Sequence, residues 1–225
     1  GLAKTIATSY HEVATCVLMC YSAMLSSEQR NDKYYIIKAI KLSKFIFPYI
    51  SETMRNDKEV VLAVVQEHEE ALQYASDKLK NDKDVVFAAV ETWGSTLKWA
   101  SDALKNDKEV VLAAVQEWAF ALNYASDSLK NDKIVSLTAV QQDGDAFKYT
   151  SEALQNDKEV VLAAVQQNGR ALRLASEFQH DKEVVLAAVQ QTGRALLYAS
   201  EDLQDDKEVV LAAVQTYGSA LDYVS

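Results

Sequence analysis

The sequence predicts an all-α fold, an α-solenoid of about eight 25-residue helix-turn-helix repeats with an N-terminal helical cap. The decapeptide DKEVVLAAVQ occurs four times, beginning at Asp107, Asp157, Asp181 and Asp206. Successive Asp-Lys pairs are spaced by 25 residues, with one step of 24, and a fixed period of this size is typical of a solenoid. The composition agrees, because one proline and six glycines leave few helix breakers among many good helix formers.

Each repeat is predicted to begin with a helix. The Asp-Lys pairs place the repeat starts near residues 31, 56, 81, 106, 131, 156, 180 and 205. Asn56 is followed three residues later by Glu59, a capping-box spacing in which side chains satisfy the N–H groups that a helix start leaves free. The run Val-Val-Leu-Ala-Ala-Val is apolar on all sides of a helix, so we expect neighbouring helices to cover it all round.

A turn and a second, shorter helix are predicted to follow. Glycine stands twelve residues after the Asp in five repeats, and a left-handed glycine can end a helix without a Cβ clash. These glycines are Gly94, Gly144, Gly169, Gly193 and Gly218. Beyond the turn, segments such as RALRLAS place apolar residues at helical spacing beside polar Arg173, which predicts an amphipathic, half-exposed helix.

The last part of each repeat is predicted to be a connection. The single 24-residue step arises where SEALQND, at Ser151, becomes SEFQHD, at Ser176. Loss of one residue inside a helix would rotate everything beyond it by about 100° and misalign the buried face. We therefore expect a connection here, with a short helical turn capped by its serine.

Residues 1–30 are predicted to form the N-terminal helical cap, and residues 31–225 the tandem repeats. Terminal units of a solenoid are atypical, and the first repeat changes most core residues. The last repeat stops partway at SALDYVS, so we expect a fragment of a longer protein, with Leu221, Tyr223 and Val224 partly bare. Such an uncapped C-terminal unit could support end-to-end self-association.

Charge and residue types argue against several functions. A net charge of −10 repels phosphate backbones and anionic lipids, so no nucleic-acid partner is expected. The longest apolar stretch, residues 13–25, is too short for a membrane span. Cys16 and Cys20 lack a second pair, and the three histidines, His11, His68 and His180, occupy different contexts. We therefore expect no metal site, no cofactor and no enzyme activity.

The segment NDKEVVLAAVQQNGRALRLASE, residues 156–177, resembles a repeat family catalogued as a domain of unknown function, frequent in large proteins of intracellular bacteria that infect amoebae. The shared features are Asp-Lys-Glu-Val-Val, the glycine after the first helix and Ala-Leu-x-Tyr-Ala-Ser. Lys44, Glu69 and Ala119 replace the glycine in three repeats. The resemblance implies no activity; it implies a module of a larger bacterial effector, cytoplasmic or delivered into a host cytosol.

Function is predicted to lie at the positions on either side of the glycine turn, where the repeats differ and which a regular solenoid aligns along one edge. Aromatic residues and arginines dominate protein–protein hot spots, so we expect this edge to dock a protein partner. The alternative is that the tryptophan rings pack locally over neighbouring turns. The candidate residues are Trp93, Trp118, Phe120, Asp143, Asp145, Arg170, Arg194 and Tyr217.

Other rows of residues are interpreted as structural. The repeated Asp-Lys-Glu positions could be a cation ladder or a carboxylate pair, but caps and first-turn acids are what helix starts require. The tyrosines at 74, 124, 149, 198 and 223 are interpreted as a stacked seam. The leading hypothesis is therefore a non-catalytic scaffold or targeting module that binds a protein. A structural spacer or self-associating rod is the alternative, and an enzyme with a deep titratable pocket is a third.

Overall fold

A computed structural model of the chain describes residues 26, 28–42, 47 and 50–223. Within these residues every regular element is a helix, and repeated helix-turn-helix units pack on one another. The predicted all-α solenoid is thereby confirmed. The chain divides into two compact units, 1–104 and 105–225, which are described separately. Most of the predicted N-terminal cap lies outside the described residues, together with His11, Cys16, Cys20, Lys44 and Val224.

In the first unit, the longer helices are α2 (Lys33–Leu42), α4 (Lys58–Val65) and α7 (Lys83–Val90). Helix α4 packs against both α2 and α7. The shorter elements are η1 (Gln29–Asn31), α3 (Glu52–Arg55), α5 (Ala71–Tyr74), α6 (Asp77–Lys80), η3 (Gly94–Trp99) and α8 (Asp102–Lys105), where η denotes a 3₁₀ helix.

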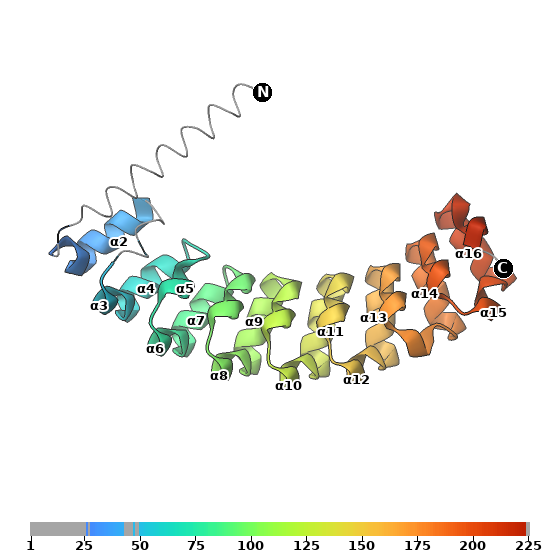
Figure 1. Cartoon of the computed structure of the whole chain (residues 1–225), viewed down its shortest axis with the longest axis horizontal. Helices are drawn as coiled ribbons and strands as arrows, with labels where there is room; N and C mark the ends of the chain where they lie inside the picture. Colours follow the sequence, from blue (N-terminus) through green and yellow to red (C-terminus); the bar gives the residue numbers. More distant parts are fainter. Residues whose placement is uncertain (1–25, 27, 43–46, 48–49, 224–225) are drawn as a thin grey trace, which may run out of the picture. The chain divides into compact units, whose positions relative to one another are not determined.

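In the second unit, five long helices pack side by side in chain order (Figure 1). They are α9 (Lys108–Glu117), α11 (Lys133–Gln142), α13 (Lys158–Gln167), α14 (Lys182–Gln191) and α16 (Lys207–Thr216). Each is followed by a six-residue 3₁₀ helix: η4 (Ala119–Tyr124), η5 (Gly144–Tyr149), η6 (Gly169–Leu174), η8 (Gly193–Tyr198) and η9 (Gly218–Tyr223). The connections contain α10 (Asp127–Lys130), α12 (Glu152–Gln155), η7 (Ser176–Phe178) and α15 (Glu201–Gln204).

The residue that caps each long helix is the aspartate, so the predicted capping box from asparagine is wrong. Asp157 accepts hydrogen bonds from the backbone N–H groups of Glu159 and Val160, at 3.0 and 3.3 Å. The asparagine before the aspartate instead accepts a hydrogen bond from the serine near the end of the same repeat. In the preceding repeat, for example, the Ser151 hydroxyl donates to Asn131 Oδ1 at 2.6 Å.

The turn after the long helix does not use left-handed glycine. No described residue, glycine included, has a positive φ. Glycine is required instead by close approach, because a Cβ on Gly144 would lie 2.9 Å from the carbonyl oxygen of Ala164 in the next repeat. Gly169 and Gly193 approach Ala188 and Ala213 in the same way. Where Glu69 replaces the glycine, the one-turn α-helix α5 stands in place of the 3₁₀ helix, whereas the repeat with Ala119 keeps its 3₁₀ helix, η4.

The second helix of the glycine-bearing repeats is 3₁₀ rather than α. The chain has few residues in which to return to the start of its repeat, and a tighter helix with three residues per turn suits a short piece. The serine after the 3₁₀ helix joins the end of the repeat to its start, since the Ser126 N–H donates to the Lys105 carbonyl at 2.9 Å. Serine then caps the short helix, as predicted: its hydroxyl accepts from the Leu129 N–H at 3.3 Å.

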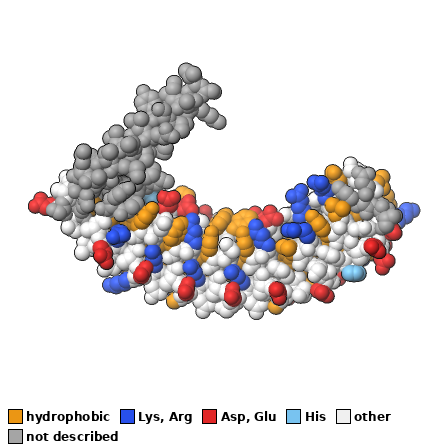
Figure 2. Space-filling model, viewed as in Figure 1, with side chains coloured by type: hydrophobic (Ala, Val, Ile, Leu, Met, Phe, Trp, Pro, Cys, Tyr) orange, Lys and Arg blue, Asp and Glu red, His pale blue; other side chains and the backbone are white. Residues whose placement is uncertain are grey.

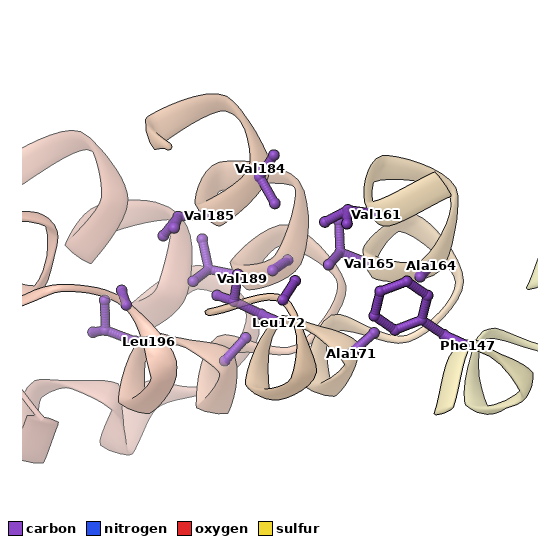
Figure 3. Packing of buried hydrophobic residues seen from close by; sticks show 14 of the residues in the cluster. Phe147, Val161, Ala164, Val165, Ala171, Leu172, Val184, Val185, Val189 and Leu196 are labelled. Carbon is purple, nitrogen blue, oxygen red and sulfur yellow. The ribbon is translucent and has the colours of Figure 1, made fainter. Parts of the chain in front are cut away.

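The core lies between successive long helices and the 3₁₀ helices beside them. In α13, Val160, Val161, Ala164 and Val165 are buried, whereas Leu162 and Ala163 are half-buried. The expectation that neighbours cover this helix all round was therefore correct for only four of the six apolar positions. Figure 3 shows valines of α13 and α14 meeting leucines of the 3₁₀ helices, with Phe147 of η5 against α13.

Ion pairs also join successive repeats. In the second unit the lysine after a capping aspartate reaches the aspartate of the next repeat: Lys133 to Asp157 at 2.8 Å, and Lys158 to Asp181 at 2.7 Å. The interpretation of the aspartates as helix caps is confirmed. Their ion pairs with lysines of the preceding repeat were not predicted from the sequence. Because the lysines are about 40% exposed, water and salt screen each pair and its contribution to stability is small.

Candidate binding surface

The candidate residues of the second unit lie where each long helix passes into its 3₁₀ helix. Trp118 and Asp143 are the C-cap residues of α9 and α11, and Tyr217 is the C-cap of α16. Phe120, Asp145, Arg170 and Arg194 are the second residues of the 3₁₀ helices that follow. We call the surface formed by these positions in the second unit the rim. Trp93 has the equivalent position in the first unit.

The aromatic residues of the rim pack partly on one another. The ring centroids of Trp118 and Phe120 are 5.7 Å apart, and those of Phe120 and Tyr149 are 6.1 Å apart. Trp118 still exposes 37% of its surface. In the first unit, Trp93 is 39% exposed, and its indole N–H donates to the Gln66 carbonyl at 3.4 Å. The rings thus pack locally, as the alternative predicts, and each tryptophan still presents a face to solvent.

The two acidic residues of the rim have different roles. Asp143 is structural, because its carboxylate accepts from the Asp145 N–H at 2.9 Å and caps η5. Asp145 is exposed, and its Oδ1 accepts from Asn168 Nδ2 at 2.6 Å, in the next repeat. The side chains on either side of the glycine therefore contact each other from one repeat to the next.

The basic residues of the rim line a cleft of about 560 Å³, formed by η5, η6 and η8. Arg170, Arg194 and Asp145, all predicted from the sequence, lie at this cleft. Lys148, Arg173, Leu174, Leu197 and Tyr198 also line it and were missed. Figure 2 shows basic side chains gathered at the edge over α13 and α14, next to hydrophobic ones.

The space for the cleft coincides with a departure from the repeat pattern. Tyr149 and Tyr198 close the 3₁₀ helices of the repeats on either side, but η6 ends with the smaller Leu174. The same repeat carries the one-residue deletion, and its Ala175 leaves η6 with φ −99° and ψ 60°, whereas Ala125 after η4 has φ −65° and ψ 159°. Leu174 is 37% exposed and Leu197 is 45% exposed, so the cleft has apolar walls as well as charged ones.

The sequence matches a known family along most of its length. A family model described as a domain of unknown function (DUF4116) matches residues 32–80, 57–105, 82–130, 107–155, 132–179 and 181–225. The chain belongs to this family. Successive matches up to residue 179 advance by one 25-residue repeat, so each of them covers two DUF4116 repeats. No curated protein and no solved structure shows significant similarity to the chain.

Aligning the DUF4116 repeats reveals the signal that could have identified the missed residues. Arg173 occupies a position that carries Gln73, Lys98, Asn123 and Lys148 in other repeats, and Leu197 is the apolar exception there. The chain has five arginines, and three of them line this one cleft. The concentration of arginines in two consecutive repeats thus marks the cleft more clearly than the aromatic residues do.

The part of the chain that the structure describes includes no group of histidine, cysteine and acidic residues arranged to hold a metal ion. Nor does any helix in the described ranges have the length and hydrophobicity needed to cross a membrane.

The predicted row of tyrosines contacts the aromatic residues of the rim. The ring centroids of Tyr124 and Trp118, for example, are 6.4 Å apart.

Proposed function

We propose that this DUF4116 chain is a non-catalytic interaction module whose rim binds a protein partner. The observation that carries the proposal is the separation of constant and variable positions. Capping aspartates, core valines and the lysines that join repeats recur, whereas the rim positions change from repeat to repeat and remain at least partly exposed. Partly exposed aromatic rings and arginines, which are frequent in hot spots, occur together on this surface.

The chemistry of the rim supports binding rather than catalysis. Arginine stays protonated in proteins, so three arginines at one cleft favour recognition of negative charge over proton transfer. The accompanying carboxylate, Asp145, is held by an amide hydrogen bond. The setting we propose is a larger bacterial effector acting in the bacterial or host cytoplasm, which the family resemblance of the sequence supports.

Site-specific photo-crosslinking tests this function. A photoreactive phenylalanine analogue would replace Phe120 on the rim in one sample and Ile134, which is 61% exposed near the N-terminus of α11, in a matched control. We expect one discrete crosslinked protein from Phe120 and none from Ile134 in host-cell lysate. That product should vanish when Trp118 is replaced by Ser in the same chain. Equal labelling from Phe120 and Ile134 would refute the proposal. So would the absence of any crosslinked product both from Phe120 and from a further sample that carries the analogue in place of Arg170.

A second candidate, self-association through the last repeat, is favoured by one observation. Leu211 of α16 is 53% exposed, whereas the equivalent Leu162 and Leu186 are half-buried. Leu221 is also 59% exposed, in line with the sequence-based expectation. Light scattering at several protein concentrations separates the two candidates. A mass that rises with concentration and falls on Leu211→Lys substitution supports the rod, and a constant monomer mass supports the interaction module.

A further inference from the structure

The cleft at η5, η6 and η8 concentrates positive charge on a protein that is acidic as a whole. Four basic side chains and one carboxylate line it, on a chain whose net charge is −10. The chain has 23 lysines and arginines, and most of the lysines follow capping aspartates or lie in the short helices. Three of the five arginines are gathered here. A local positive potential within a negative field selects small or local anionic groups rather than long polyanions.

Three of these cations are available to a ligand. Arg170, Arg173 and Lys148 are exposed, and none of the three forms an ion pair with any residue that the structure describes. Lys148 lies over the rings of Phe120 and Tyr149, at 5.4 and 4.8 Å from their centroids, and Arg194 lies 5.7 Å from that of Tyr217. These ring contacts hold the two outer cations, Lys148 and Arg194, in place beside the cleft.

The cleft also has the size and walls of a site for a few side chains. A volume of about 560 Å³ lies within the range of roughly 300–1,000 Å³ that is typical of ligand sites. Leu174 and Leu197 present apolar surface between the charged groups. Guanidinium groups bind carboxylates in a bidentate manner, and isolated leucines on a surface favour an apolar side chain opposite them.

We propose that this cleft binds a short acidic peptide segment in which aspartate or glutamate residues flank one apolar side chain. The inference rests on the proposed interaction function and specifies its partner. Carboxylates of the segment meet Arg170, Arg173 and Arg194, and the apolar side chain packs between Leu174 and Leu197. Asp145 repels acidic groups at one end of the cleft and so limits the segment to the arginine side. A nucleic acid fits less well, because its continuous backbone would run from the cleft onto the acidic remainder of the protein.

Fluorescence polarisation with the full chain and a labelled peptide, GEELEEG, tests the proposal. We expect saturable binding at peptide concentrations below about 1 mM, weakening as salt is raised from about 50 to about 500 mM. GKKLKKG should not bind, and GEESEEG should bind less tightly because it lacks the apolar side chain. Absence of binding by GEELEEG, or tighter binding of an oligothymidylate of similar charge, would overturn the proposal.

Variants taken from other repeats locate the site without endangering the fold. Arg170→Ser and Arg173→Asn introduce residues that stand at these positions as Ser95 and Asn123. The double variant should weaken binding about 10- to 100-fold, because each arginine contributes a charge-assisted hydrogen bond. Leu174→Tyr restores the tyrosine of the neighbouring repeats and should weaken binding by filling the cleft.

The matched control is Lys78→Gln with Lys207→Gln, which removes two exposed positive charges elsewhere. It should bind within about twofold of the unchanged chain once salt screens long-range charge. If the control loses as much affinity as the arginine variant, the binding is a general charge effect and the site is refuted. A crosslinked partner at Phe120 without GEELEEG binding would refute this inference alone. Peptide binding without any crosslinked partner would instead refute the proposed function.

Discussion

Ser200 should gain a hydrogen bond, and its repeat should become more stable, when His180 is replaced by Asn. In four repeats the serine hydroxyl donates to the asparagine that stands before the capping aspartate, as Ser151 does to Asn131 at 2.6 Å. His180 occupies the asparagine position twenty residues before Ser200. The Ser200 hydroxyl is buried and has no hydrogen-bond partner within the described structure, although its N–H still donates to the Gln179 carbonyl at 2.8 Å.

The expected size follows from two contacts. The introduced amide oxygen would accept from the Ser200 hydroxyl, and a net protein hydrogen bond is worth about 0.5–1.5 kcal/mol. The hydroxyl, once oriented, could also accept from the Leu203 N–H and cap α15, which has no side-chain cap now; such a cap is worth about 0.5–2 kcal/mol. The two effects share one oxygen and are not fully additive, so we expect a gain of about 1–2 kcal/mol.

Native-state hydrogen exchange at the amides of α15 is the appropriate assay, because repeats of a solenoid open locally and a single unfolding midpoint averages over them. His180→Ala is the matched control: it removes the imidazole without supplying an acceptor. Asn131→His should make the opposite change, reducing the protection of α12. Equal protection of α15 in His180→Asn and His180→Ala would refute the reasoning, since the gain would then not come from the amide oxygen.

Three further predictions follow from the same structure. Gly169→Ala should lower the free energy of unfolding by about 1–3 kcal/mol in chemical denaturation, because a methyl group there would overlap the Ala188 carbonyl. Gly218→Ala is the control: nothing lies within 4 Å of its Cβ position, so the loss of stability should be less than about 0.5 kcal/mol. The free energy of unfolding should fall in acid. The hydrogen bond from Lys133 lowers the pKa of Asp157 below its ordinary value near 3.8. The stabilisation by the ionised Asp157 is therefore complete above that pH and is lost as pH falls through the lower pKa of the folded state. Asp157→Asn keeps a capping oxygen but should flatten that part of the pH–stability curve, and an unchanged curve would contradict the assignment. Trp93→Ser with Trp118→Ser should leave the helical circular dichroism spectrum intact, because both rings are more than one-third exposed; loss of helicity would instead make them core residues.

The sequence predicted the stack and its core because both depend on periodicity alone. A repeat of Val-Val-Leu-Ala-Ala-Val in register requires that one helix face the next, and Val160, Val161, Ala164 and Val165 are buried accordingly. The connection at Ser176 was predicted by the same logic, since only a segment outside the packed helices tolerates a deletion. There the short α-helix of other repeats becomes the three-residue η7.

The features that the sequence did not predict depend on distances between repeats. Nothing in one repeat distinguishes a glycine needed for left-handed φ from a glycine needed because the next helix passes close by. Gly144 belongs to the second kind, as the 2.9 Å separation from Ala164 O shows. The ion pair of Lys133 could not be predicted from one repeat, because its partner, Asp157, lies in the next repeat. The cleft required the placement of Lys148, Arg173 and Leu197 across three repeats.

This dependence on three repeats determines where specificity can arise in such a chain. The aspartate cap, the buried valines and the hydrogen bonds of the serine act within one repeat or between two, so most repeats keep them, although α11 has Ser136 in place of a buried valine. Arg170 and Arg173 are exposed and form none of these contacts, so they can change without loosening the stack. A binding cleft nevertheless needs η5, η6 and η8 together, because each supplies a different part of its charge. The proposed recognition is therefore a property of a run of neighbouring repeats, and moving the residues of one repeat alone to another place in the solenoid should not transfer it.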